Sequence, residues 1–170
     1  MPTLVLQALY PALVRIFDPY QSTIMSVIEH IKKVAVRHGE AYYSMEEWCW
    51  KFNPVEETRK GVYIFVSKDG DILKVGKADG KRGLLGRLNE YWKPSKSFLK
   101  NPSSSASVMK RVQEADRRVV DAVIYYIPLD PIQVTVSSFS IQATPARELE
   151  EFIAARAHEE GHSLLFSKQK

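Results

Sequence analysis

Two residues in the middle of the chain have the types and spacing needed to bind a phosphodiester. Arg87 and Tyr91 are four positions apart, and Leu84, Leu88 and Trp92 around them are typical of the apolar face of a helix. On such a helix both side chains project from one face. A guanidinium fork can bind two phosphate oxygens at once. Taken separately, each residue is equally compatible with an ordinary surface position.

The segment before this helix has the pattern of a β-hairpin. Two apolar runs flank the dipeptide Asp69-Gly70, which is a common two-residue turn. With this dipeptide in the loop, Tyr63 faces Gly76 across the strands and shares its face with Lys74. The opposite face is the expected core and carries Val62, Ile64, Val66, Leu73 and Val75. Because glycine in mid-strand often marks the close approach of a ligand, the pattern indicates a ligand site or an amphipathic hairpin with a tyrosine at its rim.

Basic residues are concentrated in the same region. Residues 61–100 carry nine Lys and Arg against four Asp and Glu, a net charge of +5, whereas residues 1–60 are neutral overall and residues 101–170 carry −1. This imbalance indicates either a solvated face or a patch that binds a polyanion, with phosphate as the expected target. The expected substrate-binding residues of such a patch are Lys81, Arg82 and Lys93.

Composition and residue patterns constrain the organisation of the chain. Its 170 residues suffice for one compact domain, and 45% apolar with 26% charged residues exclude fibrous and wholly disordered classes. The single cysteine, Cys49, excludes an internal disulfide framework and indicates a reducing, cytoplasmic setting. Residues 20–39 and 44–52 have helical patterns, so residues 1–60 are expected to form a helical extension. No apolar run reaches membrane-spanning length.

In order and spacing these features resemble the GIY-YIG nuclease superfamily. Its pattern is a Gly-Ile-Tyr strand, a hairpin, a Tyr-Ile-Gly strand, and a helix with Arg followed four residues later by His or Tyr. Gly61-Val62-Tyr63, Lys74-Val75-Gly76 and Arg87-Leu88-Asn89-Glu90-Tyr91 stand for these motifs. The resemblance covers about residues 61–155. Lysine in place of the second tyrosine, and Tyr91 in place of histidine, are most similar to the restriction-endonuclease branch. The asparagine often found near the family's C-terminus has no counterpart.

The resemblance implies hydrolysis of DNA phosphodiester bonds with one Mg²⁺, for which Mn²⁺ can substitute. Tyr63 would take the proton of the attacking water, and Arg87 would hold the phosphate. A tyrosine of ordinary pKa, near 10, is a poor base unless cations such as Lys74 and Lys77 lower that pKa. Tyr91 would hydrogen-bond the phosphate or assist Tyr63.

The same resemblance requires a glutamate on the last helix as the metal ligand. The acids available there are Glu148, Glu150 and Glu151, and the inward side is expected to carry Leu149, Phe152, Ile153 and Arg156. Glu148 lies one turn before Phe152, near the helix N-terminus, where the dipole favours a carboxylate. We therefore expect Glu148 to bind the metal, with Glu151 as the second choice.

A second metal pattern lies at the end of this helix. Residues 158–162 match the zinc pattern His-Glu-x-x-His, which requires both histidines on one helical face. Gly161 is a natural helix stop and no third ligand follows, so we do not expect a zinc site.

These patterns together predict an α+β protein. A helical N-terminal extension over residues 1–60 precedes a GIY-YIG-like nuclease domain over 61–170, a small hairpin-based sheet flanked by helices. The expected function is a Mg²⁺-dependent DNA endonuclease of restriction or mobile-element type. The alternatives are a nucleic-acid-binding protein that keeps the fold without cleaving and a protein-interaction module. DNA is the expected partner, a homodimer would supply two sites for two strands, and no membrane association is expected.

Overall fold

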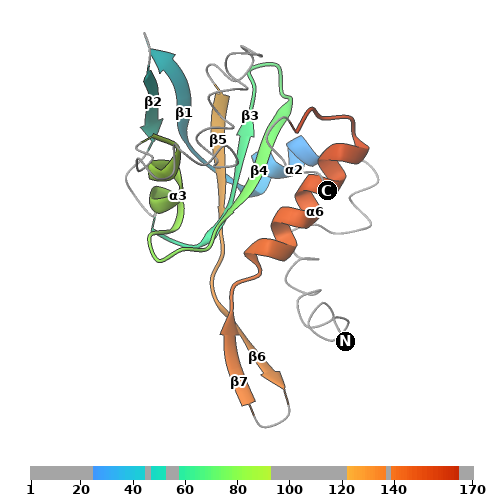
Figure 1. The fold of residues 1–170 in the computed structure, drawn as a ribbon. Coiled ribbons are helices and arrows are strands. Elements are labelled where there is room, and N and C mark those ends of the chain that lie inside the picture. The colour runs from blue at the N-terminus through green and yellow to red at the C-terminus, as the bar shows by residue number, and fades with distance from the viewer. Residues whose placement is uncertain (1–24, 45–46, 53–57, 93–121, 137–138, 165–170) are drawn as a thin grey trace, which may run out of the picture.

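A five-stranded antiparallel sheet forms the centre of the protein, in the strand order β2-β1-β5-β3-β4 (Figure 1). The computed structural model describes residues 25–44, 47–52, 58–92, 122–136 and 139–164. The strands are β1 (Val36–Ser44), β2 (Glu47–Phe52), β3 (Gly61–Val66), β4 (Ile72–Ala78) and β5 (Ala122–Pro128). The predicted α+β class, with an antiparallel sheet flanked by helices, is confirmed.

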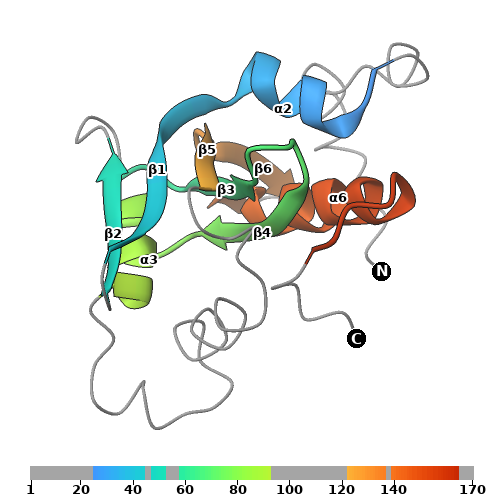
Figure 2. The ribbon, with the colours of Figure 1, turned by 90° about the horizontal axis from the view of Figure 1, so that it is seen from above.

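Helices cover both faces of the sheet (Figure 2). Helices α2 (Val27–Val34) and α6 (Ala146–Glu159) pack on the face that carries Val62, Ile64 and Val66 of β3, and α3 (Gly83–Trp92) lies on the other face. Buried Ile31 of α2 and Leu149 of α6 belong to the same core cluster as the three β3 residues. Within the described part of the chain, no helix is long and apolar enough to cross a membrane.

The register of the β3–β4 hairpin agrees with the sequence over most of its length. Tyr63 pairs with Gly76 and Phe65 with Lys74, as the Asp69-Gly70 turn predicts. Next to the turn the register shifts, so that Val66 pairs with Ile72. Ile72 therefore joins the core cluster in the place expected for Leu73, which is buried outside that cluster.

Residues 36–52 correct the prediction of a wholly helical extension. In the described part of the predicted helix over 20–39, residues 27–34 form α2, which Ser26 and Glu29 open with a reciprocal capping box. Gly39 does not end this helix but lies at a register shift within β1. The predicted helix over 44–52 is wrong, because this segment forms the end of β1 and β2. Pairing of β1 with β5 is a long-range contact that local helix signals do not contain.

Hydrogen bonds join the C-terminal end of α6 to helix α2 and to the turn before β4. The Glu160 carboxylate accepts hydrogen bonds from the Val27 backbone N–H at 2.8 and 3.1 Å, at the start of α2. Asp71, in the turn before β4, accepts a bond from the Ser163 backbone at 2.9 Å and lies 3.3 Å from His162 Nδ1. These contacts fix α6 against β4 and so determine which of its acids face the sheet.

A second, two-stranded sheet lies between β5 and α6 in the chain. Strands β6 (Ile132–Val136) and β7 (Phe139–Ala143) form an antiparallel hairpin that projects away from the central sheet (Figure 1). The two strands pair from Ile132–Ala143 to Val136–Phe139.

Candidate active site

Tyr63 and Arg87 meet on the α3 face of the sheet. The Arg87 Nε donates a hydrogen bond to the Tyr63 hydroxyl oxygen at 3.3 Å. The Tyr63 side chain is 0% exposed, and its ring lies 5.7 Å from that of Phe65. A Cβ atom placed on Gly76 would lie less than 3.0 Å from the Tyr63 hydroxyl oxygen. Glycine at position 76 therefore allows the phenol to lie across β4. The predicted pairing of Tyr63 with Gly76 is confirmed, but the buried Tyr63 ring occupies the space that was expected to admit a ligand.

Close backbone packing sets the start of α3, and with it the position of Arg87. Gly83, the first residue of α3, has φ of +50°, and a Cβ there would collide with the backbone of Thr58 and Arg59. The Tyr126 hydroxyl donates a hydrogen bond to the Arg59 carbonyl. Burial raises the pKa of Tyr126, so this phenol remains a protonated donor.

Glu150 is the acid that the structure brings to the basic side chains of the site. Burial raises the pKa of Glu150, and attraction from Lys74, Lys77 and Arg87, with a hydrogen bond from the Lys77 backbone, offsets only part of that shift. The carboxylate is therefore half-buried among three cations that come from β4 and α3. Arg87 links this carboxylate to Tyr63, because the guanidinium bonds the phenol and also attracts Glu150.

The other two acids of α6 lie elsewhere. Glu151 is exposed and pairs with Arg147 at 2.9 Å. Glu148 is not among the groups that raise or lower the pKa of Glu150, and it lies on another side of the helix. The metal-ligand role predicted for Glu148 stays a prediction without support from these contacts. Glu150 is the residue that sequence reasoning passed over.

A helical wheel shows why Glu150 was passed over. The buried residues of α6 are Ala146, Leu149, Ile153 and Ala157. At 100° per residue, Glu150 lies about 55° from the centre of this stripe and Glu148 about 145° away. Phe152, which was expected to point inward, is 41% exposed. When Phe152 is included among the buried residues, the centre of the expected buried face of α6 shifts toward Glu148.

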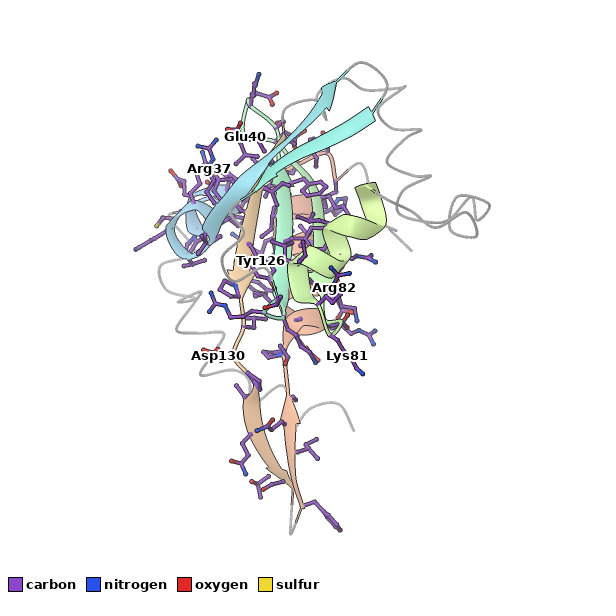
Figure 3. All side chains as sticks on the ribbon, turned by 90° about the vertical axis from the view of Figure 1, so that its left-hand side faces the viewer. Arg37, Glu40, Lys81, Arg82, Tyr126 and Asp130 are labelled. Atoms are coloured by element: carbon purple, nitrogen blue, oxygen red, sulfur yellow. The ribbon has the colours of Figure 1, made fainter. Side chains whose placement is uncertain are left out.

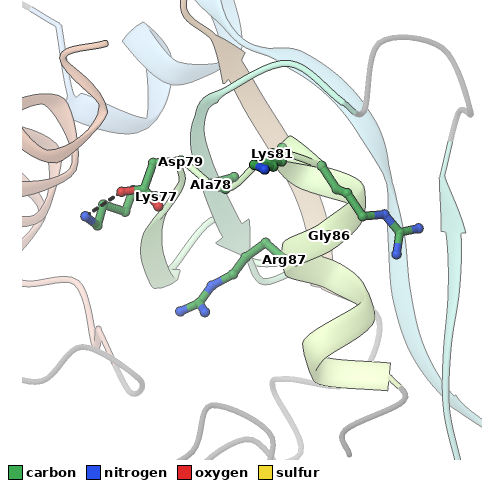
Figure 4. Close-up of a pocket in the computed structure, with 9 residues that line it drawn as sticks. Lys77, Ala78, Asp79, Lys81, Gly86 and Arg87 are labelled. Atoms are coloured by element: carbon green, nitrogen blue, oxygen red, sulfur yellow. Dashed lines mark hydrogen bonds and ion pairs between the residues drawn. The ribbon is translucent and has the colours of Figure 1, made fainter. Parts of the chain in front are cut away.

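A basic hollow adjoins the cluster. A cavity of about 390 Å³ is lined by residues of β4, the following loop and α3, among them Lys77, Lys81, Arg82 and Arg87 (Figure 4). Lys77 forms an ion pair with Asp79 at 2.7 Å within it. Lys81 and Arg82 lie at the end of the sheet from which the β6–β7 hairpin projects (Figure 3). Lys77, Lys81 and Arg87 thus line one hollow, as a polyanion site requires.

Three remaining predictions concern Tyr91, Lys93 and the His-Glu-x-x-His pattern. The side chain of Tyr91 and the whole of Lys93 lie outside the described residues. His162 follows the end of α6, after Gly161 at φ +82°, and lies against Asp71 rather than on the helical face of His158. Among the described residues, no three His, Cys, Asp or Glu side chains gather where they could hold a metal ion.

A restriction endonuclease is similar to this chain in structure. The similarity to restriction endonuclease HPY188I, solved in complex with product DNA, covers 78% of this chain and 79% of that chain, with 16% sequence identity and a TM-score of 0.47. No family model matches the sequence, and no curated protein matches it. The functional assignment therefore rests on the geometry of the site itself.

Proposed function

We propose that this protein is a Mg²⁺-dependent endonuclease that hydrolyses DNA phosphodiester bonds, of restriction or mobile-element type and related to the GIY-YIG nucleases. The observation that carries the proposal is the hydrogen bond between Tyr63 and Arg87, where Arg87 lines a basic hollow and also attracts the Glu150 carboxylate. A phenol, a guanidinium and a carboxylate from three different elements supply a proton acceptor, a phosphate ligand and an anionic cation ligand.

The residues present fit a hard divalent cation at Glu150. Mg²⁺ retains several waters and is commonly bound by one or two carboxylates together with substrate phosphate. A single half-buried carboxylate whose burial cost is only partly offset by its neighbours matches that requirement. When bound there, the ion would offset negative charge on the phosphate and on the leaving oxygen.

The side chains of the chain itself would position and activate the reactants. Arg87 would turn its guanidinium, which offers five donors, toward the scissile phosphate while Nε remains close to Tyr63. Tyr63, as the phenolate, would take one proton from the attacking water as the water oxygen bonds to phosphorus and the bond to the leaving oxygen breaks. Lys74 and Lys77 would stabilise negative charge in the transition state. Two copies of the chain would be needed to place a site on each DNA strand.

One observation favours a second function. The Tyr63 side chain is 0% exposed, so water reaches its hydroxyl only if Arg87 or its surroundings move. A chain in which that movement does not occur would bind nucleic acid through the basic hollow without cleaving it. Cleavage assays separate the two functions.

The deciding experiment is cleavage of supercoiled plasmid, branched DNA and single-stranded DNA with and without Mg²⁺. We expect Mg²⁺-dependent cleavage by the wild type and a loss of at least about 100-fold, near 3 kcal/mol, in Glu150→Gln, with DNA binding retained. Glu148→Gln on the same helix is the matched control and should cleave like the wild type. Cleavage lost in Glu148→Gln but kept in Glu150→Gln would overturn the ligand assignment. If the wild type cleaves none of these substrates, the nuclease proposal is wrong and the second function, nucleic-acid binding without cleavage, remains.

A further inference from the structure

The β6–β7 hairpin stands apart from the core of the protein. Its two strands pair only with each other among the described strands, and Figure 1 shows them projecting beyond the end of the central sheet. Phe139 is 74% exposed and Ile141 is 58% exposed. Both are large apolar side chains on strand β7.

The register separates the hairpin into a polar and an apolar set of positions. Directly paired residues lie on the same face of a ladder, and successive residues alternate. One set consists of the pairs Gln133–Gln142 and Thr135–Ser140, whose Thr and Ser hydroxyls lie 3.0 Å apart. The other set consists of the pairs Ile132–Ala143, Val134–Ile141 and Val136–Phe139. Every residue type in this second set is apolar.

Such a hairpin is expected to require a partner. A two-stranded sheet is marginally stable in water by itself and gains stability when an apolar face is packed. Exposed apolar residues gathered on one face, next to a polar face, mark an interaction surface. Here the described structure leaves Phe139 and Ile141 exposed on such a face.

The charge of the hairpin identifies the partner. Residues 132–143 contain no charged side chain, in a chain with a net charge of +4. Contact with DNA draws on Lys and Arg for the phosphates, and none is available here. In a two-fold symmetric contact a patch meets its own copy, so an uncharged apolar patch pairs with itself without like-charge repulsion. We propose that the apolar face of the β6–β7 hairpin, centred on Phe139 and Ile141, binds the same face of a second copy of this chain.

The size of the hairpin sets the expected strength of this contact. Strands of five residues span about 17 Å, so one face covers less than the roughly 800 Å² per partner of a standard interface. The dimer should therefore be weak, with a dissociation constant in the micromolar range. The contact does not depend on the proposed nuclease activity, and its test needs no substrate.

Sedimentation velocity of the full chain between about 1 and 200 μM tests the proposal. We expect concentration-dependent dimerisation of the wild type and a dissociation constant raised by about 30-fold or more in Ile141→Lys, because each dimer buries this side chain twice. Gln142→Lys adds the same charge on the adjacent polar face and should dimerise like the wild type. A wild type that stays monomeric throughout the range, or two variants with equal dissociation constants, would overturn the proposal.

A photo-crosslinking residue in place of Ile141 provides a second, independent measurement. Crosslinks between copies should map to residues 132–143 of the second copy. Crosslinks between copies that map elsewhere would show that another surface forms the dimer. If the wild type is monomeric and Ile141→Ser weakens DNA binding, the face belongs to DNA and the proposal is wrong.

Discussion

Gly76 and Tyr63 are in close steric contact at the centre of the site. A Cβ at position 76 would fall on the Tyr63 hydroxyl, whereas a Cβ at Gly80 in the neighbouring loop would have no atom within 4 Å. Gly76→Ala should therefore displace the phenol from Arg87 and reduce cleavage by about 100-fold, the usual cost of a misplacement near 1 Å. Gly80→Ala is the matched control and should remain close to wild type. Equal cleavage by both variants would show that the phenol has no part in the reaction.

We expect the ionised Glu150 side chain to destabilise the folded protein although cleavage requires it. The pKa of Glu150 is raised by burial, so the folded state binds its proton more readily than the unfolded state does. The charged form therefore destabilises the folded protein at pH above this raised pKa, and this penalty disappears as the pH falls below the ordinary value of 4.5. Glu150→Gln should accordingly raise Tm at pH 7 while it abolishes cleavage. Thermal unfolding of the wild type and of Glu150→Gln at pH 7 and pH 4 measures the sign of the stability difference and its pH dependence. A Tm of Glu150→Gln below that of the wild type at pH 7 would contradict the prediction.

The residues of the site differ in how far the sequence specifies them. Tyr63, Lys74 and Gly76 could be placed because the alternation of period two fixes faces without tertiary information. The predicted two-residue turn is not the observed one, but the register shift next to the turn restores the predicted pairs from Phe65–Lys74 onward. Glu150 could not be placed in the same way. Its assignment depends on whether Phe152 is inside or outside, and a large apolar residue is not always buried.

At the scale of elements, the junction of α6 with the β3–β4 hairpin positions Glu150 against β4. Asp71 is its polar centre: burial would raise the pKa of Asp71, but hydrogen bonds from Ser163 and contact with His162 outweigh this and hold the pKa below its usual 3.8. A depressed carboxylate pKa stabilises the folded state above the unfolded value, and this stability is lost as the pH falls through the folded value.

Asp71→Asn should therefore destabilise the protein at pH 7 by about 1.5–3 kcal/mol, the range for hydrogen bonds to a charged group. The difference from wild type should begin to shrink as the pH falls below 3.8, where Asp71 of the unfolded chain becomes protonated, and should be lost once the pH passes the lower pKa of the folded protein. Urea unfolding at both pH values measures this. Asp69→Asn, in the exposed turn nearby, is the control. An equal loss of stability in both variants would show that the hydrogen bonds of Asp71 do not stabilise this junction.

The elements also show where local signals fail. Helix α2 could be predicted because its apolar spacing is a local property of its sequence. The capping box of Ser26 and Glu29 is local as well, but the prediction did not use it. Strands β1 and β2 could not, because their pairing depends on β5, which lies about eighty residues later in the chain. The capping-like sequence at Ser44 and Glu47 is instead a pair of facing positions in the β1–β2 ladder. Long-range pairing overrides a weak local preference there.

At the scale of the whole molecule, the positive charge is concentrated where the site lies. Residues 61–100 carry a net charge of +5, more than the +4 of the entire chain. The described part of this stretch forms β3, β4, the loop with Lys81 and Arg82, and α3. The basic hollow, the Tyr63–Arg87 pair and Glu150 thus lie where the field of the protein attracts a polyanion.

This arrangement predicts how DNA binding depends on salt. Each phosphate contact releases counterions, so the logarithm of the association constant falls with the logarithm of salt concentration by about 0.9 per contact. Lys81→Ser and Arg82→Ser should each reduce this slope by about one and weaken binding to all sequences alike. Lys32→Ser, on an exposed position of α2 across the sheet from α3, removes the same charge and should leave the slope unchanged. Fluorescence anisotropy over a salt series measures all three variants. Equal effects of the three would mean that DNA responds to net charge alone and that the hollow does not bind it.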